Sequence, residues 1–316
     1  MAGGLCESVG EADADIGGIG ILTAFGAQGF ISLVLSFWVL YLSSRGKLNI
    51  KHAEGTPQYE VETKRQELLA DILIMGNDAQ VLTDIALIIT GLASARTIDL
   101  YHLHLIFDTV SLVGVSNTAT MICWSVPAAR MPCYQSRRKP GRLSRFTPRM
   151  LATYLFFALF LALTILINVK LNSWDEDVSG RCYHTHLAMS PFAKHPRDDQ
   201  IYISITSIWL LLNIVGPSYG KVKETSKVLA LGLTQYPLHL YMLIAMRTAN
   251  QDFLEGDHAE NEWKFGQTIA VVLLGVTICG IMYAIYEVWE FHESTKENSS
   301  GSVKATVPNL QYDEAK

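Results

Sequence analysis

The chain has 316 residues, of which 49% are hydrophobic and only 17% charged, and its formal net charge is −5. An average soluble domain carries about 25% charged residues. The basic residues lie between apolar blocks and form no recognisable nucleic-acid-binding motif, so nucleic acid is not expected as a partner. The blocks are about 20 residues long, which is the length that crosses a bilayer. The composition therefore predicts an all-α, polytopic membrane protein in contact with membrane lipid.

Seven apolar blocks follow one another and predict a seven-helix transmembrane bundle within residues 16–291. The preceding polar segment, residues 1–15, has four acids and no base, which does not fit a cleavable signal peptide. The following residues, 292–316, are charged and rich in Ser and Glu, and disorder is predicted there. The sixth block contains several polar residues and Pro237, so it either crosses the membrane or lies partly in its surface. The predicted spans are 16–42, 79–95, 98–124, 150–168, 201–219, 228–246 and 265–289.

The third span is the most informative, because it is apolar enough to cross a bilayer and yet carries imidazole and carboxyl groups. An acid at membrane depth costs a few kcal/mol on insertion scales, and such residues usually face a bundle interior or a cavity. His104 and Asp108 are four residues apart, so their side chains can meet on one helix face. This span is therefore predicted to form the wall of a polar pocket inside the bundle.

The second span is expected to face the third, since the connection at residues 96–100 is too short for anything but a tight turn. Gly76 interrupts a helical pattern before the second span, and Asn77 and Asp78 fit a helix N-cap there. Arg96 and Asp99 flank the turn and are interpreted as a surface pair. The polar faces expected to meet consist of Asn77, Gln80 and Asp84 on one side and Tyr101, His104 and Asp108 on the other.

The distribution of positive charge predicts the orientation. Of the 25 Lys and Arg residues, 18 lie in the first, third and fifth loops and the C-terminal tail of the seven-span arrangement. The positive-inside rule then places the N-terminus in the lumen or outside and the C-terminus in the cytosol. Localisation in the endoplasmic reticulum or another endomembrane is expected. The sequon at Asn298 lies in the cytosolic tail and is expected to be unmodified.

The cysteines and the histidines of the fourth loop show no metal-ligand spacing. Free thiols are the default expectation for all five cysteines, with pairing of Cys6 and Cys182 on the non-cytosolic side as the alternative. His184 and His186 lack a clear third ligand and are interpreted as part of an ordinary surface loop. No metal and no cofactor is predicted.

Seven spans also occur in receptors and in ion-conducting proteins. Here the third span is not followed by an acid-Arg-aromatic triplet, and the seventh has neither an Asn-Pro-x-x-Tyr motif nor a retinal-binding lysine. A receptor stays possible, because topology alone does not identify one. A channel or transporter would use intramembrane Asp and His as an ion or proton path, but the chain has no internal repeat.

A third possibility comes from the segments GNDAQVLTDIA (76–86), RTIDLYHLHLIFDTVSLVGVSN (96–117) and LTQYPLHLYMLIAMR (233–247). They resemble the fungal membrane-bound terpene cyclases of meroterpenoid pathways, such as those that make ascochlorin and ascofuranone. The resemblance implies an enzyme of secondary-metabolite biosynthesis, of the isomerase type. Its substrate would be a lipophilic, prenylated small molecule, an aromatic ring with an epoxidised farnesyl chain.

The intramembrane acids fit this chemistry, because opening an epoxide needs a proton donor in a dry pocket. Burial disfavours the charged form of a carboxyl group, so such an acid can stay protonated and act as general acid. Asp108 is the first candidate and Asp84 the second, with His104 to orient the acid or take the final proton. These three residues can equally be a structural polar network. The expected pocket residues are Tyr101, Asn77, Gln80, Phe107, Tyr236, His239 and Tyr283, of which the aromatic ones offer faces that stabilise cations.

No metal or nucleotide is required by this mechanism. The chain contains no DDxxD motif for binding a diphosphate through magnesium. This argues against a cyclase that starts by ionising a diphosphate.

Overall fold

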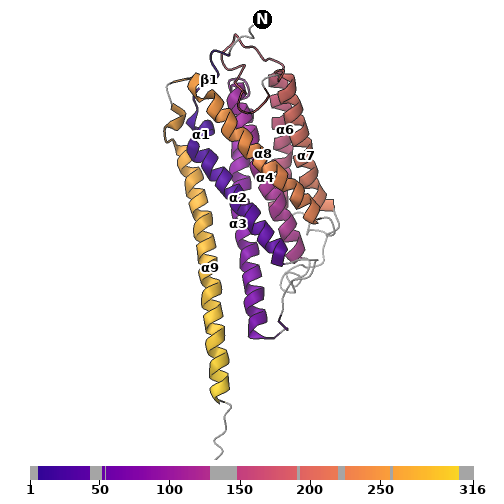
Figure 1. Ribbon diagram of the computed structural model, residues 1–316, viewed down its shortest axis with the longest axis vertical. Coiled ribbons are helices and arrows are strands. Elements are labelled where there is room, and N and C mark those ends of the chain that lie inside the picture. Colours follow the sequence, from indigo (N-terminus) through magenta and orange to yellow (C-terminus); the bar gives the residue numbers. More distant parts are fainter. Residues whose placement is uncertain are drawn as a thin grey trace, which may run out of the picture.

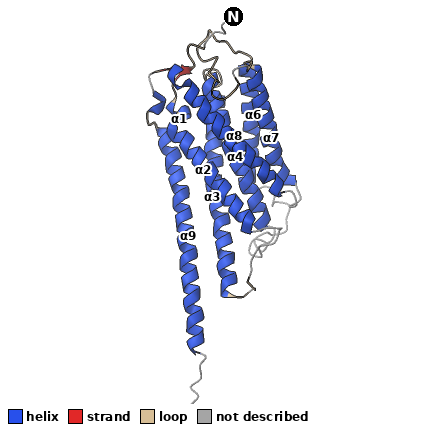
Figure 2. Ribbon diagram, in the orientation of Figure 1, coloured by secondary structure: helices blue, strands red, loops and turns tan. Residues whose placement is uncertain are grey.

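The computed structural model describes residues 6–42, 52–53, 55–128, 148–190, 193–219, 225–256 and 259–305. This part of the chain is almost entirely helical, which confirms the all-α prediction (Figures 1 and 2). Its long helices run side by side along the long axis of the molecule. They are α2 (Ile19–Leu42), α3 (Pro57–Ala93), α4 (Leu100–Ala128), α6 (Pro148–Leu171), α7 (Arg197–Tyr219), α8 (Thr225–Asn250) and α9 (Phe265–Ala305).

Four segments are long and apolar enough to cross a membrane: Ala14–Val39, Pro57–Ala93, Leu151–Leu171 and Ala259–Thr295. Large apolar side chains are exposed on the outer faces of the bundle, where a soluble protein would carry polar ones; Ile205 and Met282, for example, are 60% and 65% exposed. The fold therefore indicates an integral membrane protein. Among the described residues, helices α4, α7 and α8 are not among these four.

Helix α4 forms the centre of the bundle. Every residue from Leu100 to Thr120 is buried, and helices α2, α3, α6, α7 and α8 all pack against it. A helix covered on every side has no lipid-facing surface, so its polar residues face other helices. This position explains why the third span combines apolar residues with imidazole and carboxyl groups.

Helix α3 corrects one prediction. It continues without a break from Pro57 to Ala93, begins with Thr56 as N-cap, and passes through Gly76. The predicted interruption and N-cap at Asn77 are therefore wrong. Gly76 faces α9, where a Cβ atom would lie 3.4 Å from the Thr277 methyl group. Packing between the two helices accounts for this glycine.

Helices α8 and α9 are both longer than predicted. Helix α8 extends through Asn250 with Pro237 inside it, so the sixth segment is a full-length helix. Helix α9 continues through Ala305 and projects beyond the rest of the bundle (Figure 1). The predicted disorder is wrong for residues 292–305, and residues 306–316 lie outside the described part.

One end of the bundle is closed by a cap of three segments: the N-terminal residues 6–13, the connection of residues 172–196 and residues 251–264. Strand β1 (Gly10–Glu11) pairs in parallel with β2 (Leu254–Glu255), in the register Gly10 to Leu254. Cys6 and Cys182 form a disulfide, so the expectation of free thiols is wrong for this pair. Gly10 has φ +127°, and a Cβ atom there would lie 2.5 Å from Asp99 Oδ2. Helix α1 (Ala14–Gly17) then leads from the cap into α2.

Two 3-10 turns complete the third segment of the cap, Gln251–Phe253 and Ala259–Asn261. Asn250, at the end of α8, joins this segment to the connection of residues 172–196. Its side chain accepts a hydrogen bond from His184 N at 2.6 Å and donates one to His184 O at 2.8 Å. The cap therefore holds together chain segments that are far apart in sequence.

Candidate functional site

A buried carboxylate–imidazole pair joins α4 to α8. Asp108 Oδ1 lies 2.8 Å from His239 Nδ1 and accepts a hydrogen bond of 2.8 Å from the Tyr202 hydroxyl of α7. The Asp108 and His239 side chains are both fully buried. Because the carboxylate is the acceptor, the proton of this contact belongs on Nδ1 of His239.

The second nitrogen of His239 has no partner. Its Nε2 atom is buried and makes no hydrogen bond to the described residues. A carboxylate that holds Nδ1–H of an imidazole and leaves Nε2 free is the arrangement that prepares histidine as a general base in Ser-His-Asp triads. The geometry therefore makes His239 the best-placed base of this cluster.

His104 extends the cluster along α4. Its Nε2 atom lies 3.4 Å from Asp108 Oδ2, which confirms the predicted meeting of these side chains one helical turn apart. Its Nδ1 atom lies 3.0 Å from the Tyr183 hydroxyl. Phe107 lines the same cluster, with its ring centroid 6.4 Å from that of His104 and 6.1 Å from that of His239.

A separate polar cluster lies between α3 and the later half of α4. Asn77 Nδ2 donates to Asn117 Oδ1 at 2.9 Å, and Gln80 Oε1 accepts from the Ser116 hydroxyl at 3.0 Å. Asp84 is on the same helix and fully buried, and neither of its carboxyl oxygens has a hydrogen-bond partner among the described residues.

The predicted shared polar face of the second and third spans is therefore wrong in register. In an antiparallel hairpin, early residues of α3 lie opposite late residues of α4, so Asn77 pairs with Asn117 and not with Tyr101. His104 and Asp108 are turned toward α7 and α8 instead. Asp84 of α3 has no hydrogen-bond partner among the described residues, so no hydrogen bond joins it to Asp108 of α4.

Tyr101 lies apart from His104, beneath the cap. Its hydroxyl donates to Glu260 Oε2 at 3.3 Å. Beside it, His102 Nε2 lies 2.8 Å from Glu260 Oε1, and His102 Nδ1 lies 2.8 Å from Asp99 Oδ2. Asp99, which directly precedes α4, thus binds the imidazole of His102, and this corrects its interpretation as half of a surface pair with Arg96. This cluster ties α4 to the cap.

Tyr283 does not belong to any interior site. Its side chain is 68% exposed on α9, so the prediction that it lines the substrate pocket is wrong. The cause is its helix face: α9 covers one side of the bundle and turns Tyr283 and Tyr286 outward. Neither sequence spacing nor composition distinguishes this face from the inner one.

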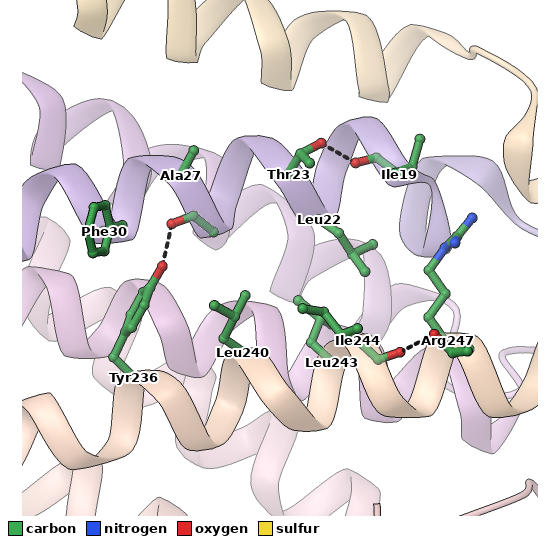
Figure 3. Close-up of a pocket in the computed structure, with 12 residues that line it drawn as sticks. Ile19, Leu22, Thr23, Ala27, Phe30, Tyr236, Leu240, Leu243, Ile244 and Arg247 are labelled. Carbon is green, nitrogen blue, oxygen red and sulfur yellow. Dashed lines mark hydrogen bonds between the residues drawn. The ribbon is translucent and has the colours of Figure 1, made fainter. Parts of the chain in front are cut away.

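A cavity of about 620 Å³ lies between α2 and α8 (Figure 3). Its walls are mostly apolar, with Tyr236 and Phe30 near one end and Arg247 near the other. The Tyr236 hydroxyl donates to Gly26 O at 2.6 Å. Tyr236 is the only predicted site residue that lines this cavity; Asp84, Asp108 and His104 do not.

The cap contributes polar groups that the sequence did not single out. Tyr183 donates to Asp199 Oδ1 at 2.9 Å, and Asp199 Oδ2 lies 2.5 Å from His195 Nδ1. The hydrogen bond to Asp199 raises the pKa of His195, whereas burial raises the pKa of Tyr183 well above its usual value. The spacing of four residues between His195 and Asp199 was the one available signal, but nothing in the sequence connects it to Tyr183.

Of the two histidines of the fourth loop, one contacts the backbone of the cap and the other is exposed. His184 Nε2 lies 2.9 Å from Cys6 O, and burial lowers the pKa of this imidazole. His186 is exposed. Among the residues that the structure describes, no group of three or more His, Cys, Asp or Glu side chains is placed to hold a metal ion.

Fold and site together define a helical membrane protein whose central helix carries a buried carboxylate–imidazole cluster. No family model, curated protein or solved structure matches the chain.

Proposed function

We propose that the protein is an integral membrane terpene cyclase that acts on a lipophilic, prenylated aromatic substrate. The resemblance of three segments to the fungal membrane-bound cyclases suggests the reaction. The observation that carries the proposal is the buried base: His239 is held by Asp108 through Nδ1 while Nε2 has no partner.

For the topology, we propose that all seven long helices cross the membrane, with the cap in the lumen or outside and the C-terminal tail in the cytosol. The Cys6–Cys182 disulfide supports this orientation, since disulfides persist in oxidising compartments. Helix α4 ends and helix α6 begins at the side of the bundle farthest from the cap (Figure 1), and the sequence between them contains a run of basic residues. Helix α4 would cross at the centre, shielded from lipid by its neighbours, whereas α7 and α8 would turn exposed apolar side chains such as Ile205 and Ile244 toward lipid. An endomembrane location is compatible with both the disulfide and the position of the basic run.

The structure favours a different division of roles from the one that the sequence suggested. Asp108 accepts hydrogen bonds from Tyr202 and His239, which suits a carboxylate. Asp84 has no donor within reach, and a buried site without a partner tolerates a neutral acid far better than a charge. We therefore assign Asp84 as the proton donor, His239 as the base and Asp108 as the residue that orients His239.

The reaction then balances as an isomerisation. Asp84 gives its proton to the epoxide oxygen, the C–O bond breaks, and the alkene π electrons of the prenyl chain form the new C–C bond. Loss of a proton from the last cation to His239 Nε2 forms the product alkene. The ring of Phe107, next to His239, offers a π face to the passing cation. Each cycle leaves Asp84 without its proton and His239 with an extra one.

The test is production of the protein in a heterologous fungus, followed by incubation of its microsomes with an epoxyfarnesyl phenol and mass spectrometry of the products. We expect cyclised product from the wild type, and a loss of about 100-fold or more in Asp84→Asn and His239→Gln, as for removal of a general acid or base. Asp78→Asn on α3 and the exposed His186→Gln serve as matched controls and keep activity. No product from folded wild type contradicts the cyclase; activity in both site variants contradicts the assigned residues.

Proton conduction is the second candidate function. The observation that favours it is the series of close polar contacts from Asp108 through His104 and Tyr183 to Asp199 in the cap. Proteoliposomes that contain a pH-sensitive dye would distinguish the two functions. A proton current without substrate is expected of a conducting protein and not of a cyclase.

A further inference from the structure

A row of titratable side chains leads from the Asp108–His239 pair to the surface of the cap. It comprises His104 on α4, Tyr183 and His195 in the connection of residues 172–196, and Asp199 in the first turn of α7. Successive members are separated by 2.5 to 3.4 Å. The row begins at a fully buried carboxylate and ends at His195, whose side chain is 20% exposed.

The inner half of the row passes through the two nitrogens of His104. Nε2 lies 3.4 Å from Asp108 Oδ2, and Nδ1 lies 3.0 Å from the Tyr183 hydroxyl. Neither His104 Nε2 nor Asp108 Oδ2 has another partner among the described residues. A distance of 3.4 Å is a few tenths of an ångström longer than a normal hydrogen bond, so a small side-chain rotation closes it.

The outer half is continuous. Tyr183 donates its hydroxyl proton to Asp199 Oδ1 at 2.9 Å, and Asp199 Oδ2 lies 2.5 Å from His195 Nδ1. Trp174 stacks on His195 with a centroid distance of 5.1 Å and meets the ring of Tyr183 edge-on at 4.9 Å. The Trp174 indole thus packs against both Tyr183 and His195 and shields this part of the row from solvent.

We propose that this row is a proton relay, through which the buried Asp108–His239 pair exchanges protons with the solvent at the cap. In outward transfer, protonated His239 gives its Nδ1 proton to the Asp108 carboxylate, and after rotation of this carboxyl group the proton passes to His104 Nε2. His104 gives its Nδ1 proton to Tyr183, and Tyr183 gives its hydroxyl proton to the Asp199 carboxylate. Asp199 gives this proton to the unprotonated Nδ1 of neutral His195, which releases its Nε2 proton past the Thr185 hydroxyl to water. His239 loses one proton, water gains one, and every group between them takes one and gives one.

Other titratable groups set the charge along the relay. Tyr202 of α7 and His239 of α8 face Asp108, and at the outer end Glu176 and Asp198 add negative charge near His195. Acids around the exit raise the proton affinity of His195, so its neutral imidazole is a suitable acceptor for a proton that arrives from Asp199.

The consequence for catalysis rests on the proposed function, because only cyclisation leaves an extra proton on His239. The relay would release that proton on the cap side and restore the base for the next turnover. Proton exchange itself does not depend on a substrate. The two proposals can therefore fail separately.

The test is nuclear magnetic resonance of the full chain in nanodiscs with ¹⁵N-labelled histidine and no substrate. Ring N–H protons of His104 and His239, assigned with His104→Gln and His239→Gln, report exchange with water through saturation transfer. Tyr183→Phe keeps the ring and removes the hydroxyl. We expect it to slow exchange about tenfold or more, because one hydrogen-bonded transfer step is lost.

His195→Gln is the second variant, and its position at the surface puts folding least at risk. It is expected to slow exchange in the same direction. Tyr241→Phe is the matched control: it also loses a hydroxyl, the one bonded to Leu187 O in the cap, but lies outside the row. The relay is overturned if exchange in His195→Gln is unchanged or faster, or if Tyr241→Phe slows exchange as much as Tyr183→Phe does. If exchange is slowed as expected but no cyclised product forms, only the proposed reaction is contradicted.

Discussion

Asp108 and His239 are 131 positions apart in the chain and meet at 2.8 Å between α4 and α8. Both side chains are fully buried, and Tyr202 contacts each of them, Asp108 at 2.8 Å and His239 at 3.1 Å. A buried contact of this kind couples the two helices energetically, in addition to preparing a base. Its strength can be measured without any assay of activity.

We expect a large coupling energy between these two residues. Removal of one partner of a buried pair destabilises a protein by about 3–5 kcal/mol, because the other polar group stays buried and unpaired. The double variant Asp108→Ala/His239→Ala should therefore lose clearly less than the sum of the single losses, by about 1–3 kcal/mol. Equilibrium unfolding in mixed detergent micelles measures the cycle. Additive losses would contradict the contact.

Asp84 is expected to respond differently. Because its carboxyl has no partner among the described residues, Asp84→Leu removes a buried polar group and breaks no hydrogen bond. We expect unfolding stability to stay unchanged or to rise by about 1–3 kcal/mol, while the proposed cyclase activity is lost. Thermal unfolding of the detergent-solubilised variant provides the measurement. A marked loss of stability would show that the carboxyl is paired, and would remove the main reason for assigning it as the neutral acid.

The local part of the site was predictable from the sequence, because His104 and Asp108 lie one turn apart on a single helix. Its long-range partners were not. The faces that α7 and α8 turn toward α4 depend on packing, so the sequence places His239 in the expected pocket without its contact to Asp108 and does not single out Tyr202. The polar residues of α8 made it look less like a membrane span, although several of them belong to the interior.

The errors at the helix ends have the same origin. Gly76 was interpreted as a break, but inside α3 it allows close approach to Thr277 of α9. Helix α9 continues beyond the membrane-like block, and α3 extends beside it, where Lys64 and Glu287 form an ion pair of 2.8 Å. This ion pair holds the last part of the apolar block against α3, but it precedes residue 292 and does not account for the helix that projects beyond the bundle.

The Cys6–Cys182 bond is expected to be present in the protein as isolated. Labelling of the denatured chain with a polyethylene-glycol maleimide should add two more labels after reduction than before, and Cys6→Ser should remove this difference. The bond closes a sequence separation of 176 residues, for which the chain-entropy treatment gives a loss of up to roughly 5 kcal/mol on removal. Membrane helices that persist in the unfolded state reduce this value. Equal labelling before and after reduction would contradict the disulfide and weaken the lumenal placement of the cap.

The His195–Asp199 contact predicts a pH dependence of stability. The contact raises the pKa of His195 above its unfolded value of about 6.5, so the protonated imidazole stabilises the fold. This contribution is complete below about pH 6.5 and is lost as the pH rises through the folded pKa. The wild type should lose its advantage over His195→Gln in thermal unfolding as the pH rises above about 6.5. His184, whose pKa is lowered by burial, acts in the opposite sense, so His184→Gln is the matched control.

The cavity between α2 and α8 is the space where we expect the hydrocarbon chain of the substrate to bind. Tyr236, near one end, is three residues from His239 on the same helix, so the cavity and the base occupy neighbouring faces of α8. Leu240→Trp should fill part of this space and raise KM about tenfold with little change in kcat, as expected for the loss of apolar contact with the substrate. Tyr283→Trp on the exposed face of α9 is the control and should leave both constants unchanged. An unchanged KM in Leu240→Trp would show that the substrate reaches His239 by another route.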